Sequence, residues 1–300
     1  MHLDKEPLDT KSYFIGGTSF PAPPLAPGLY VVATPIGNLR DITIRALETL
    51  AAASVILCED TRMSARLLDH YGIRGRRIAM HEHNERAKAD EIVGHIAAGQ
   101  AIALISDAGT PLLSDPGFPL IRGMAEAGQP VYPIPGASAL LSALVVAGLP
   151  TDAFAFHGFL PAKAGARANA LQSLAVSRET LVFYESPRRL ADTLSAMAHI
   201  WGERQAVVAL ELTKRFERVH RGALSELAAE FAGGETKGEA VIVVAGAAEA
   251  APVNEAEWLS ALASAMEGQP LRAAVDAVAA QFRLKRKDVY DAALRLKNAE

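Results

Sequence analysis

Cysteine is almost absent from this sequence of 300 residues, which contains only Cys58. A single cysteine excludes an intramolecular disulfide and a metal site built from several thiolates. Cys58 ends the apolar run Val55–Cys58, so we expect a buried structural thiol there rather than a nucleophile. Such cysteine usage fits a reducing compartment, and we expect a cytoplasmic protein.

Long hydrophobic runs and an excess of positive charge are also missing. The longest apolar stretches are far shorter than the roughly 18 residues that mark a membrane span, so no membrane partner is expected. The first residues lack the basic start and apolar stretch of a secretory signal. The formal net charge of −4 argues against a protein that wraps nucleic acid over its whole surface.

Several nucleotide and hydrolase motifs do not occur. There is no G-x-G-x-x-G after the first apolar run and no G-x-x-x-x-G-K-[ST], which counts against a Rossmann dinucleotide site and a P-loop. No G-x-S-x-G elbow is present, which weakens a hydrolase assignment. His81, Glu82 and His83 are adjacent, so on a strand they would point to opposite faces, and we expect no metal site.

The sequence does contain an alternation of short apolar runs and amphipathic segments that begins at Gly28. Near-continuous apolar strands alternating with helices predict a mainly parallel sheet covered on both faces. Expected strands are 29–33, 55–58, 102–105 and 131–134, and expected helices are 43–52, 86–98, 120–127 and 139–147. A second set has strands at 153–157, 181–184, 206–212 and 241–245, and helices at 166–176, 188–200 and 224–231.

These patterns predict an α/β protein with two α/β domains and a small helical domain. Residues 1–27, which are rich in proline near their end, are expected to be a disordered leader. The domains are expected at 28–136 and 137–247, followed by a linker. Residues 255–300 have no strand pattern and are expected to form a helix-turn-helix-like tail.

Loops rich in glycine, proline and small polar residues follow several of the expected strands. Ligands of open α/β sheets bind beyond the carboxyl ends of the strands. Glycine and proline permit close approach of the backbone to a ligand and keep a loop rigid. We therefore expect a ligand cleft between the two domains, formed by the segments 34–39, 106–117, 135–139, 184–187 and 211–214.

In this order, the loops resemble the tetrapyrrole methylase (class III methyltransferase) superfamily. The matching segments are VATPIGNLRD from Val32, CEDTR from Cys58, HNE from His83, SDAGTP from Ser106, PIPGASA from Pro133, FYESPRR from Phe183 and ELTK from Glu211. They span residues 29 to about 246, and the helical tail also fits. Within the superfamily, the Glu59–Arg62 stretch and the long loop from Ser106 resemble the enzymes that act on small-subunit ribosomal RNA.

The resemblance implies a homodimeric enzyme that uses S-adenosylmethionine to methylate the ribose 2′-oxygen of one cytidine in the decoding region of 16S rRNA. It also implies that the cofactor lies in the cleft between the domains. Carried over by position, the cofactor contacts are Pro35, Asp107, Gly109, Thr110, Leu113, Ser138, Ala139, Tyr184, Leu212 and Ala240.

A ribose hydroxyl is a weak acid, so a general base or a charge stabiliser would help it to lose its proton. The candidates near the mouth of the cleft are Glu59, Asp60, Arg62, Glu85, Glu185 and Lys214. We expect an acid among Glu59, Asp60 and Glu185 to receive or orient the proton. Arg62 and Lys214 are expected to hold flanking phosphates.

The tail carries a basic turn made of Arg283, Lys285, Arg286 and Lys287. From Gln269 to Glu300 the chain has seven basic and four acidic residues, although the whole chain is acidic. Lysine and arginine neutralise phosphates and release counterions, so we expect this turn to contact RNA. A solvated charged face is the alternative interpretation of the same residues.

Three other functions compete with this interpretation. A small-molecule methyltransferase acting on a tetrapyrrole would use the same fold, but the basic tail and the Glu59–Arg62 segment argue against it. A non-catalytic ribosome-binding protein would not need an intact cofactor cleft. A nucleotide hydrolase lacks its phosphate-binding loop in this sequence.

Overall fold

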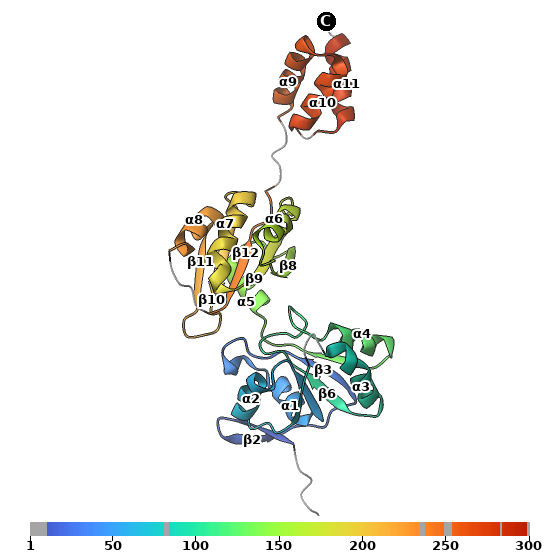
Figure 1. Cartoon of the computed structure of the whole chain (residues 1–300), viewed down its shortest axis with the longest axis vertical. Helices are drawn as coiled ribbons and strands as arrows, with labels where there is room; N and C mark the ends of the chain where they lie inside the picture. The colour runs from blue at the N-terminus through green and yellow to red at the C-terminus, as the bar shows by residue number, and fades with distance from the viewer. Residues whose placement is uncertain (1–10, 81–83, 234–237, 249–253, 283, 299–300) are drawn as a thin grey trace, which may run out of the picture. The chain divides into compact units, whose positions relative to one another are not determined.

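The computed structural model describes residues 11–80, 84–233, 238–248, 254–282 and 284–298. The chain divides into two compact units, Met1–Ala247 and Ala248–Glu300. The first unit contains two five-stranded sheets and a short hairpin, and the second contains helices alone among its described residues (Figure 1). No helix in the described part of the chain is long and apolar enough to span a bilayer.

The first sheet is wholly parallel and has the strand order β5-β4-β6-β3-β7. Its strands and helices alternate along the chain, which is why the apolar runs of the central strands are buried on both faces. The elements are β3 (Gly28–Val32), η1 (Leu39–Asp41), α1 (Ile44–Ala52), β4 (Val55–Cys58), α2 (Thr61–His70), β5 (Arg76–Ala79), α3 (Glu85–Ala97), β6 (Ala101–Leu104), α4 (Phe118–Glu126) and β7 (Val131–Ile134).

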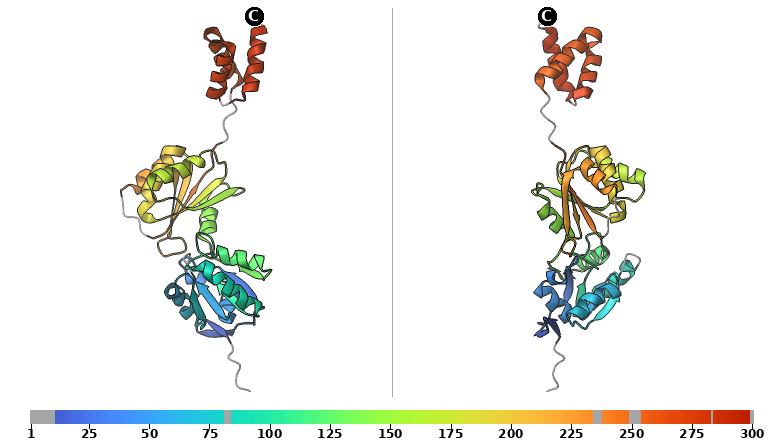
Figure 2. Two further views of the ribbon diagram at one scale, coloured as in Figure 1. Left: turned by 45° about the vertical axis from the view of Figure 1, so that its right-hand side comes forward. Right: turned by 90° about the vertical axis from the view of Figure 1, so that its left-hand side faces the viewer.

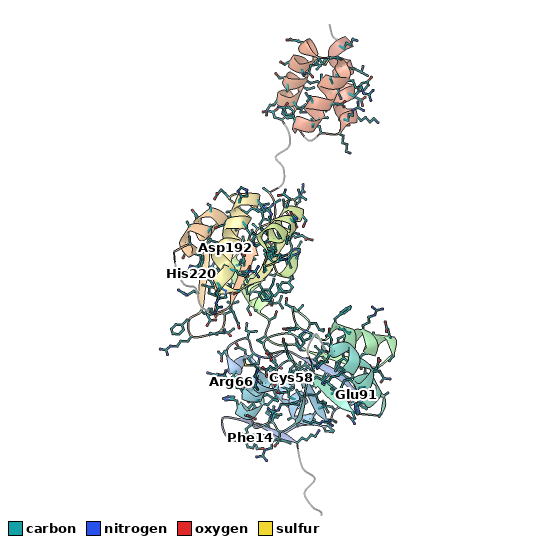
Figure 3. The ribbon with its side chains drawn as sticks, in the orientation of Figure 1. Phe14, Cys58, Arg66, Glu91, Asp192 and His220 are labelled. Carbon is teal, nitrogen blue, oxygen red and sulfur yellow. The ribbon has the colours of Figure 1, made fainter. Side chains whose placement is uncertain are left out.

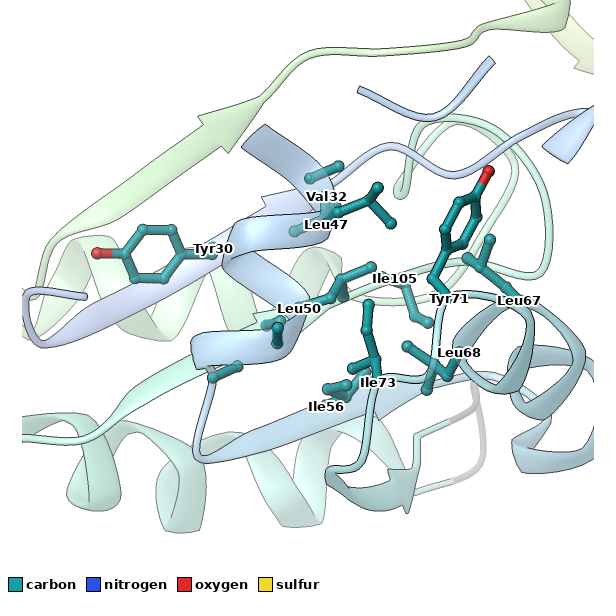
Figure 4. Packing of buried hydrophobic residues seen from close by; sticks show 14 of the residues in the cluster. Tyr30, Val32, Leu47, Leu50, Ile56, Leu67, Leu68, Tyr71, Ile73 and Ile105 are labelled. Atoms are coloured by element: carbon teal, nitrogen blue, oxygen red, sulfur yellow. The ribbon is translucent and has the colours of Figure 1, made fainter. Parts of the chain in front are cut away.

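Two apolar layers cover this sheet. Leu47 and Leu50 of α1 and Leu67 of α2 pack with Val32 and Ile56 on one face (Figure 4). On the other face, residues of α3 and α4 pack against Leu29, Leu57 and Ile102. Cys58, labelled in Figure 3, is buried in the first layer, as expected of a structural thiol. Its burial raises the pKa of the thiol.

The second sheet is mixed, with the strand order β11-β10-β12-β9-β8. Only β8 and β9 are parallel, and the other neighbours are antiparallel. Helix α5 covers one face, and α6, α7 and α8 cover the other. The elements are α5 (Ala139–Ala147), β8 (Phe154–Phe159), α6 (Ala164–Ser173), β9 (Thr180–Glu185), η2 (Pro187–Arg189), α7 (Leu190–Trp201), β10 (Gln205–Leu210), β11 (Arg218–Ala223), α8 (Leu224–Phe231) and β12 (Ala240–Val244).

The expectation that residues 1–27 form a disordered leader is wrong for residues 12–21, which form two strands. Strands β1 (Ser12–Ile15) and β2 (Thr18–Pro21) form a hairpin through Gly16 and Gly17, which both have positive φ. Tyr13 is buried in the same apolar layer as α1, and Lys11 donates to the carbonyls of Ala52 and Ala53 at the end of that helix. A two-glycine turn between the β-branched residues Ile15 and Thr18 is a hairpin pattern in the sequence.

The C-terminal unit is a bundle of α9 (Glu255–Gly268), α10 (Leu271–Phe282) and α11 (Arg286–Asn298) (Figure 2). Its own apolar core includes Trp258, Leu262, Val275, Val278 and Val289. The expected helical tail thus occurs. An apolar core independent of the sheets means that this unit can be treated as a separate folding module.

Candidate active site

A cavity of about 430 Å³ lies in the first unit and is lined by loops and strand ends of both sheets. Its walls combine apolar side chains, backbone segments and a few carboxylates. The lining residues are Ile36, Asp107, Ala108, Gly109, Thr110, Leu113, Ser114, Asp115, Ala139, Phe159, Tyr184, Glu185, Ser186, Pro187, Gly238, Glu239, Ala240 and Val241. The expected cleft therefore has a physical counterpart within the described residues.

Seven of the ten expected cofactor positions line this cavity, namely Asp107, Gly109, Thr110, Leu113, Ala139, Tyr184 and Ala240. Leu212 lines a small adjoining cavity that shares Ile36, Ala139 and Val241 with the large one. Pro35 is buried beside the lining residue Ile36. Ser138 instead caps α5, where its hydroxyl accepts a hydrogen bond from the backbone N–H of Leu141. The contacts of all ten with a cofactor stay predictions.

The loops that follow β3, β6 and β7 are tied together by short hydrogen bonds. Thr34 and Gly109 exchange backbone hydrogen bonds of 2.8 and 3.0 Å. The hydroxyl of Thr110 donates to the carbonyl of Ala137 at 3.2 Å. Gly109 has φ +83°, and a Cβ there would meet Ile36 at 3.2 Å, so glycine is required for this close approach.

The long loop after β6 contains unfavourable backbone geometry next to the cavity. Leu112 and Ser114 have φ values of +77° and +72°, which non-glycine residues rarely adopt. Each such residue costs on the order of 1–3 kcal/mol and persists only where its surroundings impose it. Leu113 and Ser114 both line the cavity, so the strained part of the backbone forms part of the cavity wall.

Two carboxylates of this loop, Asp107 and Asp115, face the cavity. Burial raises the pKa of Asp115, the nearby charge of Glu59 adds a smaller effect, and the resulting pKa is about 6. The hydroxyl of Ser106 opposes this effect. Burial also raises the pKa of Asp107, which accepts a hydrogen bond from the backbone N–H of Asp60 at 3.3 Å. A carboxyl group with a raised pKa in a cavity is a candidate acid or base.

Asp115 was not among our candidates from the sequence. The loop that contains it was singled out, but nothing in the order of residues 106–117 indicates which of its carboxylates is desolvated. The structure shows that Asp115 follows Leu112 and Ser114, whose φ values are positive, and this unusual backbone marks the position. Glu59 follows β4 and acts on Asp115 through its charge, so the structure keeps it near the candidate base.

Asp60 and Arg62 form a surface pair at the start of α2. Asp60 is the N-cap and accepts from the backbone N–H of Arg62 at 2.8 Å, and it also forms an ion pair with the Arg62 guanidinium at 2.7 Å. These bonds with Arg62 lower the pKa of Asp60 to about 2. A carboxylate with so low a pKa is a weak base at neutral pH. The Arg62 side chain is 88% exposed.

Glu185 ends β9, and its carboxylate is fully buried. One oxygen accepts from the backbone N–H of Ser186 and the other from the hydroxyl of Thr193, both at 2.7 Å. Arg189 lies 3.4 Å away as an ion-pair partner, although its Nε forms no hydrogen bond within the described residues. Glu185 therefore ties β9 to α7, which is a structural arrangement for its carboxylate.

Lys214 lies between two carboxylates rather than in open solvent. Its ammonium group is 2.9 Å from Glu211 and 3.3 Å from Glu239, which lines the cavity. Burial alone would lower the pKa of Lys214, but these partners outweigh it and raise the pKa. The stem of Lys214 also fills the space beside Gly37. Lys214 thus connects the loops after β3 and β10, and its expected role in holding phosphate stays a prediction.

The other expected site residues lie elsewhere. Glu85 accepts from the backbone N–H of Gly117 at the start of α4. Arg286 pairs with Asp276 of α10, whereas Lys285 and Lys287 are exposed and have no ion-pair partner among the described residues. Arg283 and the sequence cluster His81–His83 lie outside the described residues. In the described part of the chain, no group of side chains is suited to hold a metal ion.

The second sheet contributes an aromatic wall to the cavity. The Tyr184 ring lies edge-on to Phe156 and Phe159, with ring centres 4.7 and 5.7 Å apart. The Tyr184 hydroxyl accepts a hydrogen bond from the backbone N–H of Leu140, and burial raises its pKa. Phe159 lines the cavity and is 56% exposed, which makes its ring available to an apolar or aromatic ligand group.

Similarity to known proteins covers nearly the whole chain. Residues 28–228 match the family of Tetrapyrrole (Corrin/Porphyrin) Methylases, and residues 252–297 match the RsmI C-terminal HTH domain. Ribosomal RNA small subunit methyltransferase I of Mesorhizobium japonicum is 48% identical over 285 residues, which are 95% of this chain and 97% of that protein. The protein of the same name from Escherichia coli O157:H7 is 45% identical, over 89% of this chain and 94% of that protein.

Solved structures share the fold at lower sequence identity. The methyltransferase CobJ has a TM-score of 0.56 and 18% identity, over 75% of this chain and 96% of that chain. Uroporphyrin-III C-methyltransferase from Thermus thermophilus, complexed with S-adenyl homocysteine, has a TM-score of 0.52 and 19% identity, over 73% and 97%. The predicted α/β fold is thereby confirmed. The chain belongs to the tetrapyrrole methylase family, in the branch of the ribosomal RNA small subunit methyltransferases I.

Proposed function

We propose that this protein methylates the ribose 2′-oxygen of a cytidine in the decoding region of 16S rRNA, with S-adenosylmethionine as the methyl donor. One observation carries the proposal: a single chain joins the cavity of a methylase to the RsmI C-terminal HTH domain, at 48% identity over 95% of its length to a ribosomal RNA small subunit methyltransferase I. The enzyme works in the cytoplasm, where ribosomal subunits are assembled, and acts as a homodimer.

The cavity residues suit S-adenosylmethionine in size and charge. A volume of about 430 Å³ lies within the range of roughly 300–1,000 Å³ that is usual for ligand pockets. The carboxylate of Asp107 complements the positive charge of the cofactor. Ile36, Leu113 and Phe159 offer apolar surface for the adenine. When bound, the cofactor supplies a methyl group on a positively charged sulfur, which makes the group ready for in-line displacement.

The protein's part in the reaction is alignment and removal of one proton. Asp115 accepts the proton of the ribose 2′-hydroxyl on its carboxylate as the oxygen attacks, and later releases it to solvent. A pKa of about 6 makes Asp115 a stronger base than an ordinary aspartate while leaving it largely ionised at neutral pH. Burial is the main cause of this pKa, and the charge of Glu59 adds to it. Asp60 is held by Arg62 and Glu185 is buried, so neither suits this role as well.

Exposed basic side chains of both units hold the RNA backbone. Arg62 lies at the start of α2, Lys285 directly precedes the last helix of the C-terminal unit, and Lys287 lies in its first turn. Lysine and arginine contacts to phosphates release counterions and give binding that weakens with salt. Lys214 supports the loop beside Glu239, and Arg283, two residues before Lys285 in the sequence, carries a further positive charge.

The test uses S-adenosylmethionine with a labelled methyl group and small ribosomal subunits from cells that lack this gene. We expect one labelled nucleoside after digestion, a 2′-O-methylated cytidine identified by mass analysis. Subunits from wild-type cells are the control, because their site is already methylated and they should take up no label. Cofactor binding without label in any RNA would refute the proposal and point to a small-molecule substrate.

A further inference from the structure

The loop between β10 and β11 presents an exposed aromatic ring at a charged surface. Phe216 is 68% exposed, and the Arg215 guanidinium lies over its ring, 5.5 Å from the ring centre. Arg215, Glu217 and Arg218 are exposed too. Phe216 is therefore an exposed ring whose neighbours in the chain, Arg215 and Glu217, are both charged.

The loop that carries Phe216 is held rigidly. Glu211 and Thr213 have φ values of +51° and +66°, an unfavourable geometry that the surrounding bonds maintain. The backbone N–H of Thr213 donates to the Glu217 carboxylate at 2.6 Å, and backbone bonds join Lys214 to Glu211 and Glu217 to Lys214. A ring held out by a fixed loop loses little conformational freedom when it meets a partner.

This loop is joined to the rim of the cavity. Lys214, two residues before Phe216, pairs with Glu239, and Glu239 lines the cavity together with Gly238 and Ala240. The backbone N–H of Glu239 also donates to the Glu211 carboxylate at 2.9 Å. A molecule that reaches into the cavity from this side passes close to the loop.

We propose that Phe216, with Arg215, is a stacking platform for an unpaired nucleobase of the RNA substrate, next to the nucleotide that enters the cavity. This inference rests on the proposed function and names a positioning residue for it. Bases of single-stranded RNA stack on aromatic rings and on guanidinium planes, and a nearby arginine also neutralises the phosphate. Neither Arg215 nor Arg218 has an ion-pair partner among the described residues, so both charges are available.

A protein partner is the competing occupant, and the surface suits it less well. The centre of a protein interface is usually depleted of charge. Here every residue from Arg215 to Arg218 is exposed, and three of the four are charged. An exposed ring with Arg215 beside it and Arg218 two residues further along the chain matches a base and its phosphate better than it matches an apolar protein patch.

The first measurement compares Phe216→Ala with the matched control Phe118→Ala, which removes a ring of similar exposure, 69%, from the start of α4. Loss of one stacked base should lower kcat/KM for small subunits by about five- to a hundredfold. Phe216→Trp should stay within about threefold of wild type, since it keeps an aromatic face. Cofactor affinity should be unchanged in all three variants, which shows that the cavity is intact. Equal activity of Phe216→Ala and Phe118→Ala would overturn the inference.

A second measurement detects the contact between residue 216 and a base directly. Tryptophan fluorescence of Phe216→Trp should be quenched by a short oligocytidylate, well beyond any quenching of Phe118→Trp. Equal quenching of the two would overturn the inference. If Phe216→Ala weakens binding to small subunits but not to deproteinised 16S rRNA, the partner is a protein and the inference is wrong.

The two proposals can fail separately. If wild-type enzyme transfers no methyl group to RNA, the proposed function fails, and the quenching experiment alone decides whether a base stacks on residue 216. If methyl transfer occurs and Phe216→Ala matches its control, the function stands and the platform is refuted.

Discussion

Glu59 and Asp115 come from loops after two different strands, yet the charge of Glu59 raises the pKa of Asp115. Burial of Asp115 is the larger cause, and together they place its pKa at about 6. Burial and the charge of Glu59 therefore make Asp115 a stronger base near neutral pH than an ordinary aspartate.

We expect Asp115→Asn to lower the rate of methyl transfer by about a hundred- to ten-thousandfold, the usual contribution of a general base. In the wild type, single-turnover rate should rise with pH through about 6, as Asp115 loses its proton. The variant should lose this rise. Asp60→Asn is the matched control, since asparagine is an equally good N-cap and should leave the rate nearly unchanged. Equal rates for the two variants would rule out Asp115 as the base.

The same substitution should stabilise the fold at alkaline pH. The pKa of Asp115 is higher in the folded protein than its ordinary value of 3.8, so the folded state loses stability as pH rises from about 4 to about 6. The difference corresponds to at most about 3 kcal/mol, and partial exposure reduces it to about 1–2 kcal/mol. Urea unfolding at pH 8 should show Asp115→Asn more stable than wild type, and unfolding at pH 4 should show no gain.

Glu185→Gln separates structure from catalysis at the end of β9. The buried carboxylate accepts from Ser186 and Thr193, and an amide would place a donor against one of them. We expect the free energy of unfolding to fall by about 2–4 kcal/mol. The rate per folded enzyme should stay within about threefold of wild type at low temperature. A loss of rate in fully folded Glu185→Gln would instead show that Glu185 takes part in catalysis.

Gly109→Ala tests how closely the loops after β3 and β6 must approach. The positive φ and the contact with Ile36 should lower the free energy of unfolding by about 1–3 kcal/mol. Because Gly109 lines the cavity, cofactor affinity measured by calorimetry should fall by about tenfold or more. Gly94→Ala, inside α3 with open space around it, should instead stabilise the protein by about 0.5–1 kcal/mol.

Lys285 and Lys287 test the RNA role of the C-terminal unit. Changing both to alanine should reduce the slope of log affinity against log salt for 16S rRNA by about 1–2. Cofactor affinity should not change, since neither residue lines the cavity. Asp276→Ala, which frees Arg286 from its ion pair, is the control and should not reduce the slope. An unaltered slope in the double variant would show that this turn is a solvated face.

The buried strands were predictable from the sequence because strands covered on both faces consist almost entirely of apolar residues. Strands β4, β6 and β12 are apolar throughout, since both faces of their sheets are covered. The edge strands β5 and β11 escaped prediction because they carry exposed arginines and show no apolar run. Helix α2 was missed for a similar reason, because its residues are mostly polar. The mixed second sheet was also hidden, since strand direction depends on chain connections.

The candidate site divides in the same way. By itself, the sequence determined the ligand loops and their order, because glycine, proline and small polar residues after apolar strands are a local pattern. The tertiary structure alone decided that Asp115 is desolvated beside Glu59, that Glu185 is buried, and that Lys214 is held between Glu211 and Glu239. Charge and solvation depend on distances through space between residues far apart in the chain, and no local pattern records those distances.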